Sequence, residues 1–195
     1  MRRGPRAAAG ITLGIGLLSA IQAPTAPTTP DLCAEAIARG KALFKAGETE
    51  AALAAFDSAV SLAGASGLRC RGEALYRTGV ARDHRGEFAA ADGPLGQAEA
   101  LAHELGDEHL LASVWNHRGL MARQLAHFDE AERYFQQSEK AFRSLGENEH
   151  ASASLGNLGL VCQNRGDFSV TPSGNRSTVI GRSRKCGNSL SAMLR

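Results

Sequence analysis

The sequence predicts an all-α protein, a right-handed superhelical solenoid of antiparallel helix pairs with about three and a half repeats. Two observations predict this fold. Four glycines recur at separations of 39, 40 and 40 residues: Gly40, Gly79, Gly119 and Gly159. A turn residue follows each of them seven positions later: Gly47, Gly86, Ala126 and Gly166.

Further columns keep the same register after each turn residue. An aromatic residue or threonine stands two positions later: Thr49, Phe88, Phe128 and Phe168. A large apolar residue stands nine positions later: Phe56, Leu95 and Phe135. Small residues stand five and twelve positions later: Ala52, Ala91, Ala131, Ala59, Ala98 and Ser138. The register divides residues 31–168 into repeats at about 33–71, 72–111, 112–151 and, incompletely, 152–168.

Each repeat is expected to contain two helices, A and B, which cross at the repeated glycine. A residue without a Cβ removes a steric block at the crossing, despite a helix cost of about 1 kcal/mol. The turn glycine supplies the left-handed conformation that ends helix A. The expected helices cover residues 32–45, 49–64, 70–84, 88–105, 109–125, 129–145 and 149–164.

Residues 1–23 are predicted to be a secretory signal peptide, because three arginines precede an apolar run of about 15 residues. The protein is therefore expected to be exported, to the periplasm or the extracellular space, after cleavage. An uncleaved membrane anchor over residues 7–21 is the alternative, although a stable span needs about 20 apolar residues. Residues 24–30, PTAPTTP, are expected to form an extended linker, and Asp31 to cap the first helix.

The repeated columns of glycines, turn residues and the residues that follow them resemble the pattern of the tetratricopeptide repeat (TPR) family. The small residue of the family's helix A falls on the four repeated glycines, and its turn glycine and turn aromatic fall on the turn columns. The minimal repeat has about 34 residues, so a period near 40 resembles the extended repeats of kinesin light chains and many bacterial TPR proteins. The resemblance implies a non-enzymatic protein–protein interaction scaffold.

In this family the A helices line a concave groove that binds peptides. By their place in the repeat, the candidate groove residues are Lys41, Lys45, Tyr76, Asp83, His84, Asn116, Arg123, Gln124, Gln163 and Asn164. The expected partner is a protein or peptide, without a cofactor. A nucleic-acid partner is not expected, since the formal net charge is only +2 and acidic residues are interspersed with basic ones.

Motifs for catalysis or metal binding are not found in the sequence. The segment HELGDEH at 103–109 places its histidines six positions apart, with Gly106 between them, whereas a zinc-protease helix needs a spacing of four. Cys33 and Cys70 begin neighbouring A helices, and two states are open for them. They form a disulfide in an exported protein, or they stay unpaired because stacked helices lie ~8–10 Å apart. Cys162 is expected to be a small buried apolar residue.

The fourth repeat is expected to be incomplete. Residues 169–195 carry six serines, five basic residues and Pro172, and they show no helical period. They are expected to be disordered, either as a frameshifted end or as a natural basic tail. In the first case the chain is a fragment of a larger TPR protein that has lost an effector domain, for example a caspase-like peptidase. In both cases helix 149–164 is expected to expose apolar residues and to favour self-association.

Overall fold

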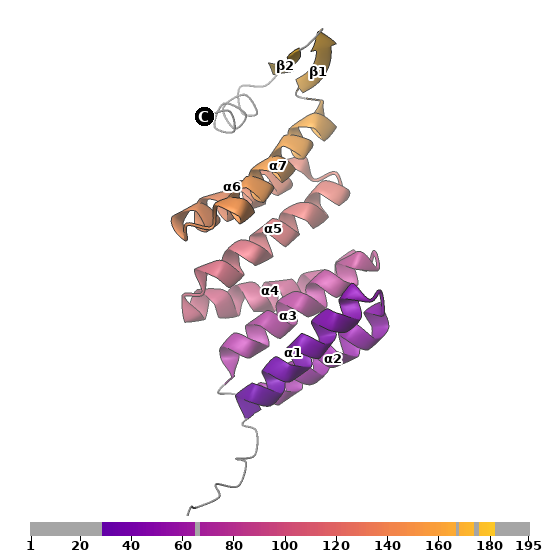
Figure 1. Cartoon of the computed structure of the whole chain (residues 1–195), viewed down its shortest axis with the longest axis vertical. Coiled ribbons are helices and arrows are strands. Elements are labelled where there is room, and N and C mark those ends of the chain that lie inside the picture. The colour runs from indigo at the N-terminus through magenta and orange to yellow at the C-terminus, as the bar shows by residue number, and fades with distance from the viewer. Residues whose placement is uncertain (1–28, 65–66, 167, 174–175, 182–195) are drawn as a thin grey trace, which may run out of the picture.

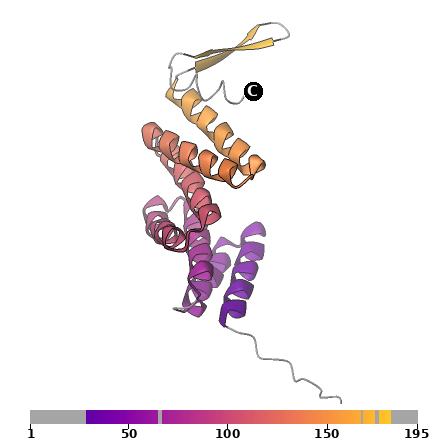
Figure 2. The same cartoon turned by 90° about the vertical axis from the view of Figure 1, so that its left-hand side faces the viewer.

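The computed structural model describes residues 29–64, 67–166, 168–173 and 176–181, and its main body is a stack of α-helices (Figure 1). The helices are α1 (Thr29–Lys45), α2 (Thr49–Leu62), α3 (Leu68–His84), α4 (Phe88–Leu105), α5 (Glu108–Gln124), α6 (Phe128–Ser144) and α7 (Asn148–Arg165). Consecutive helices pack as hairpins, and α1, α3, α5 and α7 also contact one another in turn. The side view shows an elongated column (Figure 2). The all-α solenoid predicted from the sequence is therefore confirmed.

The helix boundaries follow the repeat register closely. All seven helices lie at the expected places, and their ends differ from the expected positions by a few residues at most. The prediction for Asp31 is wrong, because α1 already begins at Thr29 and Asp31 lies inside it. Pro30 stands in the first turn of α1, where a missing N–H costs little. The predicted signal peptide and residues 24–28 of the predicted linker lie outside the described residues.

Three of the four repeated glycines, Gly40, Gly79 and Gly119, lie where helix A meets helix B, as expected. A Cβ on Gly40 would lie 2.3 Å from the Phe56 ring, and one on Gly119 would lie 2.7 Å from the Phe135 ring. Both rings are fully buried. Carbon atoms in contact are about 3.5–4.0 Å apart, so a side chain at either glycine would force the helices to separate.

The turns after the A helices adopt the left-handed conformation. Gly47, Gly86 and Gly166 have φ values of +84°, +75° and +78°. Ala126 occupies the same column with φ +61°, although the conformation is unfavourable for a residue with a Cβ. The turn geometry is therefore retained even where glycine is replaced.

Helix α4 contains a proline in its interior. Pro94 has no N–H, so the carbonyl of Ala90, four residues earlier, loses its usual helical partner. Arg82 of α3 donates to this carbonyl through Nη1 at 3.2 Å. The neighbouring A helix therefore supplies the hydrogen bond that α4 lacks.

Cys33 of α1 and Cys70 of α3 form a disulfide, with their Cα atoms 6.4 Å apart. The two cysteines whose pairing the sequence left open are thus bonded. Cα atoms lie about 2.3 Å from a helix axis, so Cα atoms that face each other come closer than the axes of stacked helices and reach disulfide distance. Cys162 is buried as expected, but it is also disulfide-bonded and is not a plain thiol.

A two-stranded antiparallel hairpin follows α7, formed by β1 (Phe168–Ser173) and β2 (Arg176–Gly181). The pairing runs from Phe168 opposite Gly181 to Ser173 opposite Arg176. The expectation of a disordered segment from 169 onward is wrong for these residues. Their β-branched residues favour strands. Residues 182–195 lie outside the described residues.

The expected apolar surface on α7 is smaller than the sequence suggested. Leu158, Val161 and Cys162 are buried, and Leu155 is half-buried. Among the apolar residues in this part of α7, Leu160 stays exposed, with 42% of its surface accessible. Self-association through α7 would therefore rest on little apolar area.

Candidate functional site

The four A helices, α1, α3, α5 and α7, form one continuous face of the stack, which we call the A-helix face. They follow one another along the near side of Figure 1. All ten residues predicted to line the groove belong to these helices. The structure divides them into three bonded groups and a set of solvent-exposed positions.

The first group lies between α3 and α5 and is buried. His117 Nε2 lies 3.0 Å from Asp83 Oδ2, and the Tyr76 ring meets the His117 ring edge-on, with centroids 6.3 Å apart. Burial lowers the pKa of His117, and His84 lowers it further, while the Asp83 carboxylate opposes both; the net pKa lies below its ordinary value. Burial also raises the pKa of Tyr76. His117 was not among the predicted groove residues, and its burial could not be seen from the spacing of the repeats alone.

The second group joins α1 to α3. Lys41 Nζ lies 3.2 Å from Glu73 Oε1, and Arg77 Nε donates to the same oxygen at 2.9 Å. Burial alone would raise the pKa of Glu73, but the two cations and their hydrogen bonds bring it below its ordinary value. Glu73 therefore stays ionised, and Lys41 is held against α3.

The third group joins α5 to α7 through amides and hydroxyls. Asn116 Oδ1 accepts from Asn157 Nδ2 and from Ser154 Oγ, both at 3.3 Å. Ser154 Oγ in turn lies 3.0 Å from Ser138 Oγ, which donates to the carbonyl of Ala112 at 2.9 Å. This network fixes the orientation of the Asn116 side chain.

The remaining predicted residues are less constrained. Lys45, Gln124, Gln163 and Asn164 are exposed. His84 is also exposed and packs against the Phe44 ring, with centroids 5.0 Å apart. The structure does not bring these residues into one compact site; they extend along the stack.

Two polar atoms of the predicted set are buried without a hydrogen bond: Asp83 Oδ1 and Arg123 Nε. A buried donor or acceptor without a partner costs about 1–3 kcal/mol, and a ligand that supplies the partner recovers this cost. Each of the two atoms has less than 1 Å² of accessible surface, so both lie beneath the A-helix face, and a ligand could reach them only if the side chains moved.

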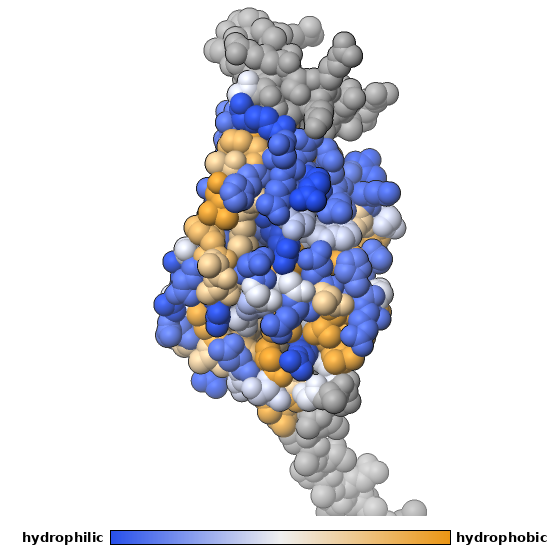
Figure 3. Space-filling model, turned by 180° about the vertical axis from the view of Figure 1, so that it is seen from behind, coloured by the Kyte–Doolittle hydropathy of each residue, from blue (hydrophilic) through white to orange (hydrophobic). Residues whose placement is uncertain are grey.

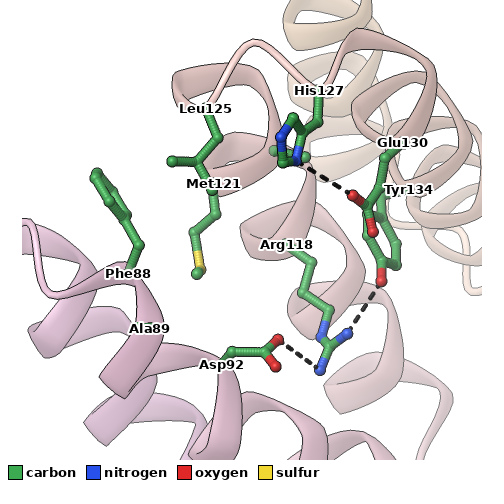
Figure 4. A pocket seen from close by; sticks show the side chains of 10 residues that line it. Phe88, Ala89, Asp92, Arg118, Met121, Leu125, His127, Glu130 and Tyr134 are labelled. Atoms are coloured by element: carbon green, nitrogen blue, oxygen red, sulfur yellow. Dashed lines mark hydrogen bonds and ion pairs between the residues drawn. The ribbon is translucent and has the colours of Figure 1, made fainter.

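A pocket lies outside the predicted groove, where α4 meets α5 and α6 (Figure 4). Its volume is about 370 Å³. The apolar side chains of its wall are Phe88, Ala89, Met121, Ala122 and Leu125. Its polar side chains are Asp92, Arg118, His127, Glu130 and Tyr134. This pocket was not predicted from the sequence, because half of its lining residues come from B helices, whereas the predicted groove consists of A-helix residues alone.

The face opposite the A helices is mainly hydrophilic, with apolar residues along its left edge and in a second patch in its lower part in Figure 3. Two of the three large apolar residues that are most exposed, Leu125 and Leu145, follow the ends of α5 and α6. Exposed apolar side chains therefore concentrate at turns.

The HELGDEH segment serves structural roles. Asp107 caps α5 by accepting from the N–H of Leu110 at 3.1 Å, and it pairs with Arg69 at 3.0 Å. His109 lies 2.8 Å from Glu147. Among the residues that the structure describes, we find no group of three or more His, Cys, Asp or Glu side chains suited to a metal ion. No described helix combines the length and the apolar character needed to cross a membrane.

Comparison with known proteins agrees with this geometry. The tetratricopeptide repeat family matches residues 112–145, which contain α5 and α6. This segment of the chain therefore matches a tetratricopeptide repeat. A solved TPR-like neighbour is BtubC (BKLC) from P. vanneervenii, with 13% sequence identity and a TM-score of 0.54 over 82% of this chain and 74% of the other. A comparison with curated proteins found no match.

TPR repeats generally mediate protein–protein interactions. The likeness to BtubC concerns the fold alone, since so little of the sequence is shared. The match to a TPR repeat over residues 112–145 therefore suggests a protein partner. The way in which such a partner would be held depends on the residues of the A-helix face.

Proposed function

We propose that this protein is a non-enzymatic scaffold that binds an extended peptide, or an extended segment of a partner protein, along the A-helix face. The observation that carries the proposal is the row of exposed polar side chains along this face, which come from three A helices: Lys45 of α1, Gln124 of α5, and Gln163 and Asn164 of α7. Their amide and ammonium groups can form hydrogen bonds with the backbone groups of a bound chain.

The bonded groups on the same face support the proposal. Ion pairs and hydrogen bonds link α1 to α3 and α5 to α7, so Lys41 and Asn116 are held in place before a ligand arrives. Fixed side chains lose less conformational entropy on binding than mobile ones. Exposed side chains such as Lys45 and Gln124 remain free to contact the ligand's own side chains.

A peptide display experiment tests this proposal. A random peptide library is selected on the chain that begins at residue 24, and the selected peptides are measured against Arg123→Ala and Gln124→Ala. We expect each variant to weaken binding, by about tenfold for Arg123→Ala, because a hydrogen bond to a charged group contributes about 1.5–3 kcal/mol.

The matched controls are Gln97→Ala and Gln137→Ala, which remove exposed glutamines from the B helices α4 and α6. These controls should bind as tightly as the unaltered chain. Peptides that respond equally to all four substitutions, or only to the controls, would overturn the assignment of the A-helix face.

We further propose that the protein is exported. The Cys33–Cys70 disulfide supports this proposal, because disulfides persist in oxidising compartments and are rare in the cytosol. Residues 1–30 fused to a reporter that is active only outside the cytoplasm should give activity. Leu17→Arg should abolish it by interrupting the apolar run. Equal activity with the arginine would contradict export through this segment.

A further inference from the structure

Two junctions between repeats are closed by an arginine that precedes the turn residue after an A helix. At the first junction Arg85 pairs with Glu50 of α2. At the last junction Arg165 pairs with Asp129 at 3.1 Å and with Glu132 at 3.0 Å, both on α6. In each case the arginine reaches back to the first turns of the preceding B helix.

The middle junction lacks this arginine. The residue that precedes its turn is Leu125, and the positions on α4 that correspond to Asp129 and Glu132 hold Ala89 and Asp92. Leu125, Ala89 and Asp92 all line the pocket of about 370 Å³ (Figure 4). The pocket is therefore the place where the chain's own arginine lies at the other two junctions.

The walls of this pocket suit a long aliphatic stem. Phe88, Met121 and Leu125 surround it, and Leu125 is 44% exposed. A volume of this size is within the range of about 300–1,000 Å³ found for ligand pockets. An arginine side chain buries its methylene stem on apolar surface while its charged head meets polar groups.

The charges at the rim are suited to a cation. The side chains of Asp92 and Glu130 are 69% and 43% exposed. The pocket's own Arg118 is already committed, since it donates to the Tyr134 hydroxyl at 3.0 Å and pairs with Glu99 and with Asp92 Oδ1, each at 3.3 Å. The exposed rim thus carries carboxylates that can accept from a further guanidinium.

We propose that this pocket receives an arginine side chain of a partner polypeptide, which takes the place that Arg85 and Arg165 occupy at the neighbouring junctions. The guanidinium meets Asp92 and Glu130, and the stem packs against Phe88 and Leu125. The site lies between α4, α5 and α6, and none of the predicted groove residues lines it, so it would be a second point of contact beyond the proposed groove.

The test uses a random peptide library selected on the chain that begins at residue 24. Peptides are then sorted by their affinity for Leu125→Arg, which supplies the missing arginine from the chain itself and should fill the pocket. We expect one class of peptides to contain arginine and to bind Leu125→Arg about tenfold more weakly than the unaltered chain. Asp92→Asn should weaken the same class.

Leu145→Arg is the matched control, because Leu145 is 42% exposed and also precedes a turn glycine, but lies outside the pocket. It should leave this class unaffected, as should Gln124→Ala on the A-helix face. Unchanged denaturation midpoints of the variants show that they fold. Loss of binding with Gln124→Ala alone would support the groove and overturn the pocket, so the two proposals fail separately.

Replacement of the peptide's arginine by citrulline, which keeps the shape and removes the charge, identifies the occupant. Binding should fall about tenfold or more, since the charged hydrogen bonds are lost. A class that is sensitive to Leu125→Arg but indifferent to citrulline would mean that an apolar side chain fills the pocket, and it would overturn the arginine assignment. The absence of any class sensitive to Leu125→Arg would overturn the site itself.

Discussion

Gly119 illustrates how one missing Cβ controls the packing of two helices. A Cβ at this position would lie 2.7 Å from the buried Phe135 ring, where α5 crosses α6. We expect Gly119→Leu to lower the free energy of unfolding by about 1–3 kcal/mol through overpacking. Gly156 of α7 is the control, because a Cβ there would meet nothing within 4 Å. Denaturant titration compares them, and equal midpoints for the two leucine variants would contradict the crossing.

The buried His117 makes stability depend on pH. Its pKa in the folded protein lies below the ordinary value, so the unfolded chain takes up the proton more readily. As the pH falls below about 6.5, the folded state should lose stability, until the pH passes below the folded pKa. His117→Gln should make the free energy of unfolding less dependent on pH between about 7 and 5. A steeper dependence in the variant would show that Asp83 holds His117 protonated instead.

Helix α4 remains continuous across Pro94 because Arg82 donates to the freed carbonyl of Ala90. We expect Pro94→Ala to raise the free energy of unfolding by about 1–3 kcal/mol, as it restores the backbone hydrogen bond. Arg82→Ala should destabilise the unaltered chain more than it destabilises Pro94→Ala. A double-mutant cycle measures the difference, and strictly additive effects would show that the two residues are not coupled.

The helices were predictable from the sequence, because the repeat period determines their positions. The positions of all seven helices followed from the glycine and turn columns. These columns predicted a continuous helix across Pro94, but they did not show which residue would donate to the freed carbonyl of Ala90. The β1–β2 hairpin was not predicted, because the expectation for residues 169–195 rested on their lack of a helical period. The strand preference of Val170, Thr178 and Val179 was present in the sequence, but it did not enter that expectation.

The candidate site was predictable only in part. The repeat register placed Tyr76, Asp83 and Asn116 on the A helices, but the pairing of Asp83 with His117 depends on the rotation of α5 against α3. The pocket also had a signal in the sequence. Leu125 interrupts the column that holds Arg85 and Arg165, and a comparison of that column would have marked the junction. The depth of the pocket depends on how the surrounding side chains pack, and the repeat columns do not show this.

At the scale of the whole molecule, the Cys33–Cys70 disulfide anchors the first helix to the second repeat, across a sequence separation of 37 residues. A closed loop of this length stabilises the folded state by about 4 kcal/mol in the chain-entropy model. We expect the double variant Cys33→Ser, Cys70→Ser to lower the free energy of unfolding by up to this amount. Added reductant should lower the free energy of unfolding more in the unaltered chain than in the variant, which keeps the disulfide of Cys162. An equal effect on both would locate the sensitivity elsewhere.

The central claim is that a polypeptide partner is held on the A-helix face. Site-directed photo-crosslinking in the native cell tests it most directly, with a photoreactive residue in place of Lys45 or Gln124 on the A helices and of Gln97 or Gln137 on the B helices. All four side chains are exposed, so the substitutions are tolerated to a similar degree. The account predicts light-dependent adducts with a partner protein from Lys45 and Gln124 and none from Gln97 and Gln137. Adducts from the B-helix positions alone would contradict it.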